Sequence, residues 1–263
     1  MAHPWFQLNL VRMIKLLLLV LVVVALVLVG CATAQRKLLY YPTHHDGANG
    51  LVPWRDGDLL IGYAREVANP RNVWLMLHGN AGQASDRAYA LPCFADDDSV
   101  YIMEYPGYGA RPGSPSKTSF NAAAAAAYRS LRKRFADKPV CVVAESIGSG
   151  PACTLASLSL PPDKFVLIVP FDTLAGVAAD HFRYLPVTWM LRDNWNNIAA
   201  LAGYRGPVEI FGAEADTIIP IRHARALAQS VPQAVFHRIR GGHNDWSTSG
   251  EVVIRANGGN GET

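Results

Sequence analysis

Short apolar runs alternate with helical stretches along most of this chain, and this alternation constrains the fold more than any other feature. The runs are compact and contain few polar residues, which is typical of strands buried on both faces of a parallel sheet. They lie at residues 72–77, 100–104, 140–144, 165–169 and 208–211. Helices are expected at residues 84–91, 116–135, 147–158 and 221–230. The alternation predicts an α/β fold, in which helices flank a mostly parallel central sheet.

The remaining segments define the limits of this predicted domain. The chain has 263 residues and half of them are apolar, which suits one domain over residues 36–256 with a sizeable core. Residues 36–41 and 59–67 are expected to form antiparallel strands before the parallel part begins. The longest interruption of the pattern, at 172–206, is predicted to be a short helical cap over the site. Residues 257–263 are rich in Gly and Asn and are predicted to be a flexible tail.

The charge balance excludes one class of partner. Charged residues make up 17% of the chain and the formal net charge is only +3. Two of the basic residues, Arg12 and Lys15, lie in the first 30 positions, so the predicted domain is almost neutral. Such a domain offers no basic face for nucleic acid, and we expect no nucleic-acid binding.

The N-terminus has the pattern of an export signal. Arg12 and Lys15 precede fourteen consecutive apolar residues, 16–29, and this order is typical of a secretory signal peptide over residues 1–30. The apolar run is shorter than the ~20 residues that span a bilayer. An uncleaved signal anchor is the alternative interpretation.

The residues at the end of this run, Leu-Val-Gly-Cys at 28–31, resemble the lipobox of bacterial lipoproteins. This resemblance implies cleavage before Cys31, lipidation of Cys31, and a short lipidated tether over residues 31–35. Ala32 stands where an inner-membrane retention signal has Asp. The resemblance therefore implies a lipid anchor in the bacterial cell envelope, at the periplasmic face of the outer membrane.

A serine lies at the junction between a predicted strand and a predicted helix. Ser146 is the centre of Ala-Glu-Ser-Ile-Gly at 144–148. This is a variant of the G-x-S-x-G turn, which holds a nucleophilic serine in a strained conformation above a sheet. Ala144 departs from the pattern because the turn crowds the positions two before and two after the serine. We predict that Ser146 is a nucleophile.

A glycine-rich turn follows another predicted strand. His-Gly-Asn-Ala-Gly occupies 78–82, directly after Leu77. A turn of this kind directs backbone N–H groups into the cleft at the carboxyl edge of the sheet, where they stabilise an oxyanion. We assign this role to the N–H groups of Asn80 and Ile147. His78 is expected to brace the loop rather than to act in catalysis or to bind a metal.

An acid and a histidine complete the predicted constellation. Asp216 follows the run at 208–211, and His243 follows a predicted strand at 235–239. The order Ser, Asp, His is the one expected for α/β-hydrolases. In this arrangement His243 deprotonates Ser146, and Asp216 holds the imidazole in the productive tautomer.

Other polar residues compete for functional roles. Glu214 is an alternative acid to Asp216, although it is less well placed before the Ile-Ile-Pro segment. His223 and His237 lie on a predicted helix and a predicted strand, so we expect surface or packing roles. The acids at 96–98 and the histidine pair at 44–45 lack further ligands at a diagnostic spacing, and the acids are interpreted as a solvated turn. We therefore predict no metal site, and the absence of phosphate-binding motifs predicts no nucleotide cofactor.

Three cysteines remain beyond the N-terminal segment. Cys93, Cys141 and Cys153 show no spacing that indicates a disulfide framework. They are interpreted as small core residues, and one disulfide stays open as an alternative because an exported domain is in an oxidising compartment.

Taken together, these motifs resemble the α/β-hydrolase superfamily, and more narrowly the small serine hydrolases grouped with serine-aminopeptidase and ABHD-type acyl hydrolases. The resemblance extends over about residues 36–245. It rests on Leu-Tyr-Tyr-Pro at 39–42, the turn at 78–82, Glu-Tyr-Pro-Gly-Tyr-Gly at 104–109, Glu-Ser-Ile-Gly at 145–148, Pro-Phe at 170–171, Phe-Gly at 211–212 with the segment 216–220, and Gly-His-Asn-Asp at 242–245.

The resemblance implies a hydrolase that needs no cofactor, with Ser146, Asp216 and His243 as its triad. It also implies that the segment 105–109 packs near the active-site loops. The chain departs from the family after His243, because residues 247–263 show only a weak amphipathic pattern where members have a closing helix.

The sequence thus predicts a lipid-anchored serine hydrolase that cleaves carboxylic or lipid-derived acyl esters or thioesters through an acyl-enzyme. Its partners would be a small-molecule or lipid acyl ester and, through the anchor, a membrane. Two alternatives stay open. One is an aminopeptidase-like peptidase, which would require an acidic group to hold the amine of the substrate. The other is a non-catalytic envelope lipoprotein that uses the fold for binding.

Overall fold

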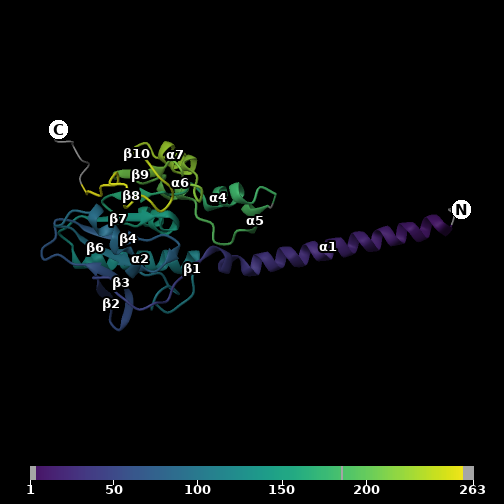
Figure 1. Cartoon of the computed structure of the whole chain (residues 1–263), viewed down its shortest axis with the longest axis horizontal. Coiled ribbons are helices and arrows are strands. Elements are labelled where there is room, and N and C mark those ends of the chain that lie inside the picture. Colours follow the sequence, from purple (N-terminus) through teal and green to yellow (C-terminus); the bar gives the residue numbers. More distant parts are fainter. Residues whose placement is uncertain (1–3, 185, 257–263) are drawn as a thin grey trace.

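A long helix projects from an α/β body in the computed structural model of this chain (Figure 1). The structure describes residues 4–184 and 186–256, except for the side chains of residues 4–10, 28, 31–34 and 189. The body is built around an eight-stranded sheet in the order β10-β9-β8-β7-β4-β6-β3-β2. Its strands are β2 (Val52–Asp56), β3 (Leu59–Arg65), β4 (Val73–Leu77), β6 (Ser99–Met103), β7 (Val140–Glu145), β8 (Phe165–Ile168), β9 (Val208–Ala213) and β10 (Ala234–Ile239).

The direction of the strands confirms the predicted fold class. All neighbouring pairs from β10 through β6 are parallel, whereas β3 pairs antiparallel with β6 and β2 pairs antiparallel with β3. The parallel strands are almost entirely buried because helices or extended chain cover both faces of the sheet.

Each face of the sheet packs against its own layer. In β4, Val73, Leu75 and Leu77 point to one face, whereas Trp74 and Met76 point to the other. The first face packs against α2 (Lys117–Arg134), α3 (Ser149–Thr154), α6 (Asn197–Leu201) and α7 (Ile221–Ser230). The second face packs against the 3₁₀ helix η1 (Ala84–Cys93) and the C-terminal segment. The predicted core cysteines Cys93, Cys141 and Cys153 are free and buried in these two layers.

After His243, where members of the family have a closing helix, the chain covers the sheet with an extended segment instead. Trp246, Val252 and Ile254 are buried in the second layer. The N–H of Ile254 donates to the carbonyl of Cys93 at 2.9 Å, which ties the segment to η1. The core beneath it is therefore closed without a helix. The predicted tail at 257–263 lies outside the described residues.

The N-terminal part of the chain differs from the prediction. The predicted strand at 36–41 is wrong, because helix α1 (Pro4–Leu39) extends through most of it. Leu, Lys, Arg and Gln dominate residues 35–39 and favour a helix. Only β1 (Tyr41–Pro42) is extended, and it pairs in parallel with β5 (Ala81–Gly82). Among the described residues, no helix has both the length and the apolarity needed to cross a membrane.

Three further elements depart from the sequence pattern. The edge strand β2 was not predicted, and Pro53 together with the two charged residues that follow Trp54 explains the weak signal. The predicted helix at 84–91 is the 3₁₀ helix η1, which contains Pro92. The predicted helix at 147–158 is divided into η2 (Ser146–Gly148), α3 and η3 (Leu155–Ser157).

The acidic run at 96–98 forms the predicted solvated turn only at Asp96 and Asp97, which are exposed. The side chain of Asp98 is fully buried. It accepts hydrogen bonds from the amide of Asn72 at 2.7 Å and from the indole N–H of Trp74 at 2.9 Å. Asp98 therefore fixes the start of β4, the strand that leads to the glycine-rich turn.

We expect Asp98→Ala to destabilise the fold by about 2–4 kcal/mol, because it leaves the buried indole N–H of Trp74 without an acceptor. Asp97→Ala is the matched control, since Asp97 is exposed, and it should change stability by no more than about 0.5 kcal/mol. Urea unfolding of both variants measures the difference. Equal stability of the two variants would contradict this role of Asp98.

Candidate active site

The predicted nucleophile occupies a strained turn at the carboxyl end of a central strand. Ser146 directly follows β7 and begins η2, which leads into α3. Its φ is +54°, a left-handed conformation that non-glycine residues rarely adopt. The strand–turn–helix context predicted from the sequence is therefore present, and the turn raises Ser146 above the edge of the sheet.

Small residues lie two positions before and two positions after Ser146, and different contacts limit their size. A Cβ atom at Gly148 would lie 2.3 Å from the carbonyl oxygen of Leu77 and 2.8 Å from that of His78, so only glycine fits. Ala144, in contrast, is buried in the core between Leu77 of β4 and Leu167 of β8. Its methyl group replaces the usual glycine hydrogen without disturbing the register of β7.

We expect Gly148→Ala to destabilise the protein by at least about 1–3 kcal/mol, because both atoms that the new methyl group meets belong to the backbone. Gly203→Ala is the control, since no atom lies within 4 Å of a Cβ built there. Urea midpoints of the two variants provide the measurement. An unchanged midpoint for Gly148→Ala would mean that the turn does not depend on this close approach.

The structure brings Ser146, His243 and Asp216 into one hydrogen-bonded chain. The Nε2 atom of His243 lies 2.9 Å from Oγ of Ser146, and its Nδ1 atom lies 2.7 Å from Oδ2 of Asp216. All three side chains are buried. They come from the loops after β7, β9 and β10, so the carboxyl edge of the parallel sheet assembles them from distant parts of the sequence.

The surroundings of Asp216 determine which nitrogen of the histidine carries the proton. The other oxygen of Asp216, Oδ1, accepts the backbone N–H groups of Ile218 at 2.8 Å and Ile219 at 2.7 Å. The carboxylate is thus held in place and accepts the Nδ1–H of His243. This leaves Nε2 as the acceptor for the hydroxyl of Ser146, the arrangement that general-base activation of a serine requires.

The competing residues lie elsewhere. Glu214 is exposed and pairs with Arg238 at 2.6 Å, so it does not replace Asp216. His237 stacks on Phe211 in β9, with ring centroids 4.6 Å apart, which is a packing role. The described residues contain no group of three or more side chains that could hold a metal ion.

The glycine-rich turn at 78–82 follows β4 as predicted, next to the serine turn. The side chain of Asn80 donates to the carbonyl of Leu39 at 2.5 Å and accepts the hydroxyl of Tyr108 at 3.0 Å. Its backbone N–H has no acceptor within residues 4–184 and 186–256. The side chain therefore fixes the turn while the backbone N–H stays available for a ligand.

A buried acid, Glu145, links the serine turn to the glycine-rich turn. Its Oε2 atom accepts the backbone N–H of Gly79 at 3.2 Å and lies 3.3 Å from the hydroxyl of Tyr89. The two turns thus share one carboxylate. This role was not predicted from the sequence, in which the available signal is an acid at the end of an apolar strand, directly before the serine.

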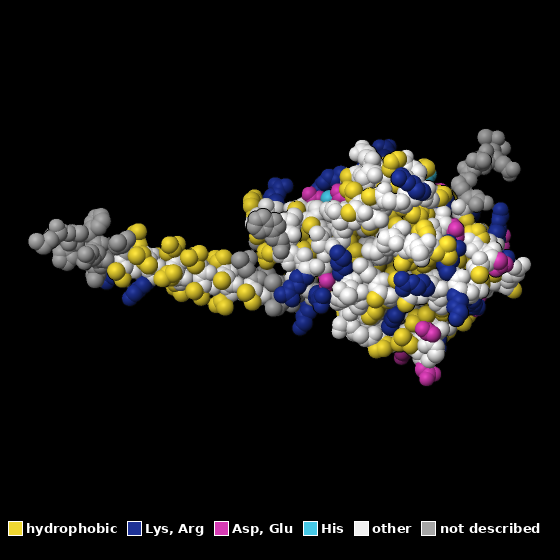
Figure 2. Space-filling model, turned by 180° about the vertical axis from the view of Figure 1, so that it is seen from behind, with side chains coloured by type: hydrophobic (Ala, Val, Ile, Leu, Met, Phe, Trp, Pro, Cys, Tyr) yellow, Lys and Arg dark blue, Asp and Glu magenta, His cyan; other side chains and the backbone are white. Residues whose placement is uncertain are grey.

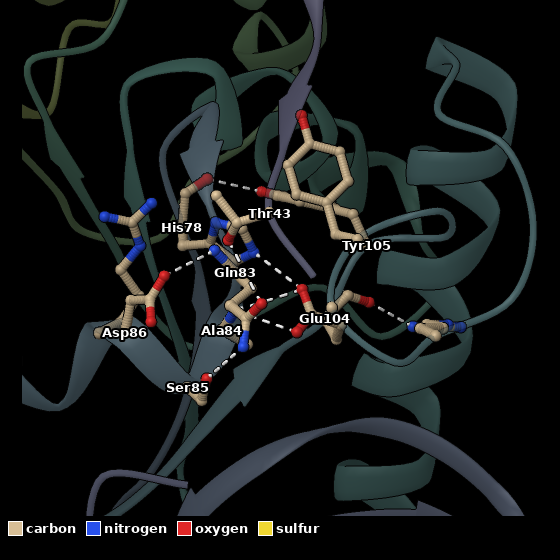
Figure 3. A network of polar contacts seen from close by, with 12 residues as sticks. Thr43, His78, Gln83, Ala84, Ser85, Asp86, Glu104 and Tyr105 are labelled. Atoms are coloured by element: carbon tan, nitrogen blue, oxygen red, sulfur yellow. Dashed lines mark hydrogen bonds and ion pairs between the residues drawn. The ribbon is translucent and has the colours of Figure 1, made fainter. Parts of the chain in front are cut away.

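A second buried acid holds the far side of the glycine-rich turn (Figure 3). Glu104 accepts the backbone N–H of Ala84 through both oxygens, at 3.1 and 3.2 Å. It also lies 3.5 Å from Nε2 of the fully buried His78. The ring of Tyr105 packs on His78 at 4.4 Å, and its hydroxyl donates to the carbonyl of His78 at 2.8 Å. His78 therefore braces the loop, and the segment 105–109 packs against it as the resemblance implied.

Residues 172–206, which were predicted to form a helical cap, contain α4 (Leu174–His181), α5 (Val187–Met190) and α6. Two histidines fasten the first part of this segment to the body. His223 of α7 bridges two acids, with Nδ1 2.8 Å from Asp172 and Nε2 2.6 Å from Asp180 of α4. His181, at the end of α4, lies 2.8 Å from the carbonyl of Ile218. These contacts fasten α4 to α7 and to the loop that holds Asp216.

The bridge at His223 makes stability depend on pH. The hydrogen bond to Asp172 raises the pKa of His223, burial opposes this, and Asp180 adds to the increase. Among the described residues, the one further charged group in the bridge is Arg222, which pairs with Asp180. The pKa of His223 is higher in the folded state than its ordinary value of about 6.5. Charged His223 therefore makes its full contribution to stability below about pH 6.5. This contribution is lost as the pH rises through the pKa of the folded state.

We therefore expect the stability lost in His223→Gln to be larger at about pH 6 than at about pH 9. Urea unfolding of the native protein and the variant at both pH values measures this difference. His44→Gln is the control, because the exposed His44 contacts only the carbonyl of Gly109 among the described residues. A stability loss that does not change with pH would contradict a charged bridge.

The fold and the arrangement of these side chains define the chain as a hydrolase-type α/β protein. The chain belongs to the alpha/beta hydrolase family, whose sequence model matches residues 74–257. An uncharacterized protein of Mycobacterium tuberculosis (strain CDC 1551 / Oshkosh) is 32% identical over 243 residues, which cover 84% of this chain and 86% of that protein.

Other relatives and structures carry names of hydrolases. Lysophosphatidylserine lipase ABHD12 of Danio rerio is 28% identical over 198 residues, which cover 65% of this chain and 50% of that protein. An esterase structure from Pyrococcus furiosus has a TM-score of 0.58 at 12% identity and covers 80% of this chain and 94% of that chain. The structure of a Butyrivibrio proteoclasticus protein, Est1E, with bound ferulic acid has a TM-score of 0.56 at 13% identity and covers 67% of this chain and 82% of that chain. At these identities the two structures establish the fold alone.

Proposed function

We propose that this protein is a serine hydrolase that cleaves carboxylic or lipid-derived acyl esters through an acyl-enzyme. The observation that carries the proposal is the continuous hydrogen-bonded chain from Ser146 through His243 to Asp216. The φ of +54° at Ser146 adds support, because a binding protein has no use for a strained serine beside a buried histidine.

In the first half of the reaction, Nε2 of His243 takes the hydroxyl proton of Ser146 while Oγ attacks the carbonyl carbon of the ester. Asp216 stabilises the imidazolium that forms. The N–H groups of Asn80 and Ile147 stabilise the negative oxygen of the tetrahedral intermediate. His243 then gives its proton to the departing alcohol, the bond between carbon and the alcohol oxygen breaks, and the acyl group stays on Ser146.

The second half releases the acid. His243 takes a proton from water, and the resulting oxygen nucleophile attacks the acyl carbon. The bond to Oγ breaks, and His243 returns the proton to Ser146. No metal or cofactor is needed for either half. The two turns that hold the N–H donors are cross-linked by Glu145, which keeps both donors in place while charge forms and disappears.

Lipid-derived esters are the substrate class that we favour. The chain carries fourteen consecutive apolar residues, 16–29, and a related protein is named a lysophosphatidylserine lipase. This chain spans about half the length of that relative. We also propose that the protein is anchored in a bacterial cell envelope, either by α1 itself or by acyl chains on Cys31. The side chain of Cys31 lies outside the described residues.

A fluorophosphonate probe tests the proposed function. The full chain in mild detergent should be labelled, and Ser146→Ala should abolish the labelling. His243→Ala and Asp216→Asn should each slow it by at least about 100-fold, because they remove the base or its correct tautomer. Ser157→Ala is the control and should be labelled like the native protein, since Ser157 is the exposed last residue of η3.

Two outcomes would contradict a serine hydrolase. One is the absence of labelling in a native protein that unfolds cooperatively. The other is labelling of Ser146→Ala at the native rate, which would place the reactive group elsewhere. A labelled protein then receives p-nitrophenyl esters of increasing chain length. A preference for the shortest ester, without any gain from micelles, would contradict lipid-derived substrates.

A further inference from the structure

The base of α1 is fixed to the body beside the candidate site. Leu39, at the end of α1, accepts a hydrogen bond from the side chain of Asn80 at 2.5 Å. One turn earlier, Gln35 donates to the carbonyl of Met190 at 3.1 Å and accepts the N–H of Arg192 at 2.7 Å. The helix therefore leaves the body from the carboxyl edge of the sheet, next to the loops that form the site (Figure 1).

The helix presents a large apolar surface that nothing in the described chain covers. Its side chains from Leu16 to Val24 are all exposed, and Leu26 is 66% exposed. Figure 2 shows these apolar side chains along a helix that stands clear of the body. An apolar surface of this extent needs a non-aqueous environment. Fourteen helical residues are about 21 Å long, so this part of the helix extends well into a hydrocarbon layer of about 30 Å.

The turn between α4 and α5 carries two exposed aromatic residues. Phe182 is 55% exposed and Tyr184 is 93% exposed. The residue before them, His181, contacts the carbonyl of Ile218, whose N–H donates to Asp216. After α5, the chain contacts Gln35 of α1. The aromatic turn therefore lies between the loop that holds Asp216 and the base of the apolar helix.

The charged side chains around this turn that have no ion pair in the described part of the chain are all basic. The acidic residues of the segment 172–206 are all engaged with a basic partner, and they are Asp172, Asp180 and Asp193. The basic residues Arg183, Arg192 and Lys37 are exposed, and the described part of the chain gives none of them an ion pair. Figure 2 shows Lys and Arg side chains where the helix meets the body. Exposed aromatic rings with unpaired cations match the interfacial region of an anionic bilayer.

We propose that Phe182, Tyr184, Arg183, Arg192 and Lys37 form a docking surface for a bilayer that contains anionic phospholipid. The lipid meets the protein at the base of α1, whether the apolar helix or acyl chains on Cys31 provide the anchor. Docking presents the edge of the sheet that carries Ser146 to the membrane. A lipid ester then reaches the serine from the bilayer rather than from water. This consequence rests on the proposed function, whereas the docking surface itself does not.

The experiment places a fluorescent probe on the proposed surface in the full chain. Cys31→Ser is combined with Tyr184→Cys, and the introduced thiol is labelled with an environment-sensitive fluorophore, because Cys93, Cys141 and Cys153 are buried. The control is Leu160→Cys in the same background. Leu160 is 60% exposed and lies before β8, at the amino edge of the sheet. Both proteins are reconstituted into phosphatidylcholine vesicles with phosphatidylglycerol.

We expect brominated lipid to quench the probe at position 184 at least about threefold more than the probe at 160, since bromine quenches only at close range. Arg183→Glu together with Arg192→Glu should abolish this difference, because like charges repel the anionic surface. Equal quenching at 184 and 160 would overturn the proposal. A blue shift at 184 that rises with protein concentration, without quenching by lipid, would also overturn it and would indicate a second copy of the chain.

Activity separates this inference from the proposed function. Phe182→Ser with Tyr184→Ser should slow hydrolysis of an ester held in vesicles by at least about fivefold, because the site no longer faces the lipid. The same variant should hydrolyse a short soluble ester at the native rate. If the native protein hydrolysed neither ester, the proposed function would be refuted, whereas the quenching result would be unaffected. If the variant hydrolysed both the vesicle-held ester and the soluble ester as fast as the native protein does, docking would be overturned as the route of access.

Discussion

The close approach between the end of β4 and the turn after β7 is the contact on which the site depends. Gly148 packs directly against the carbonyl oxygens of Leu77 and His78, and no other residue fits there. This contact sets the position of Ser146, and it also places the glycine-rich turn beside it. Because the same backbone atoms border both turns, a displacement of either would move the serine relative to the N–H groups that we assign to the oxyanion. The relative position of the two turns is therefore set by backbone packing and does not depend on the catalytic side chains.

Two buried carboxylates stabilise this arrangement from opposite sides. Glu145 accepts the N–H of Gly79 in the glycine-rich turn, and Glu104 accepts the N–H of Ala84 at the start of η1. Charge-assisted hydrogen bonds therefore hold the start of the turn and the residue just beyond its end. A buried carboxylate is costly unless donors satisfy it, and these backbone groups would otherwise lack acceptors in the interior. Each group therefore offsets the desolvation of the other. This explains why a loop rich in glycine is rigid enough to hold N–H groups in a fixed direction.

The sequence predicts those features that depend on local pattern. Apolar runs located the parallel strands, and the order of Ser146, Asp216 and His243 placed three residues that the structure brings together. Features that depend on tertiary contacts were missed. Asp98 looked like one acid of a solvated turn, yet the indole of Trp74 holds it inside the core. Residues 36–39 looked like a strand, yet their residue types also favour a helix, and the ion pair of Arg36 with Asp193 adds a tertiary contact that the sequence does not reveal. For Asp98 the deciding partner lies in another strand of the sheet.

Asn80 connects the chemistry to the attachment of the N-terminal helix. Its backbone N–H is one of the assigned oxyanion donors, while its side chain accepts the hydroxyl of Tyr108 and donates to the carbonyl of Leu39. A carbonyl at the end of a helix has no partner within the helix, so it readily accepts this donor. The residue that positions the oxyanion donor is therefore the residue that receives the end of α1. The next element, β1, also pairs with β5 (Ala81–Gly82) of the same turn. The apolar helix is therefore joined to the glycine-rich turn both through the side chain of Asn80 and through backbone pairing, at the edge of the sheet that carries the serine.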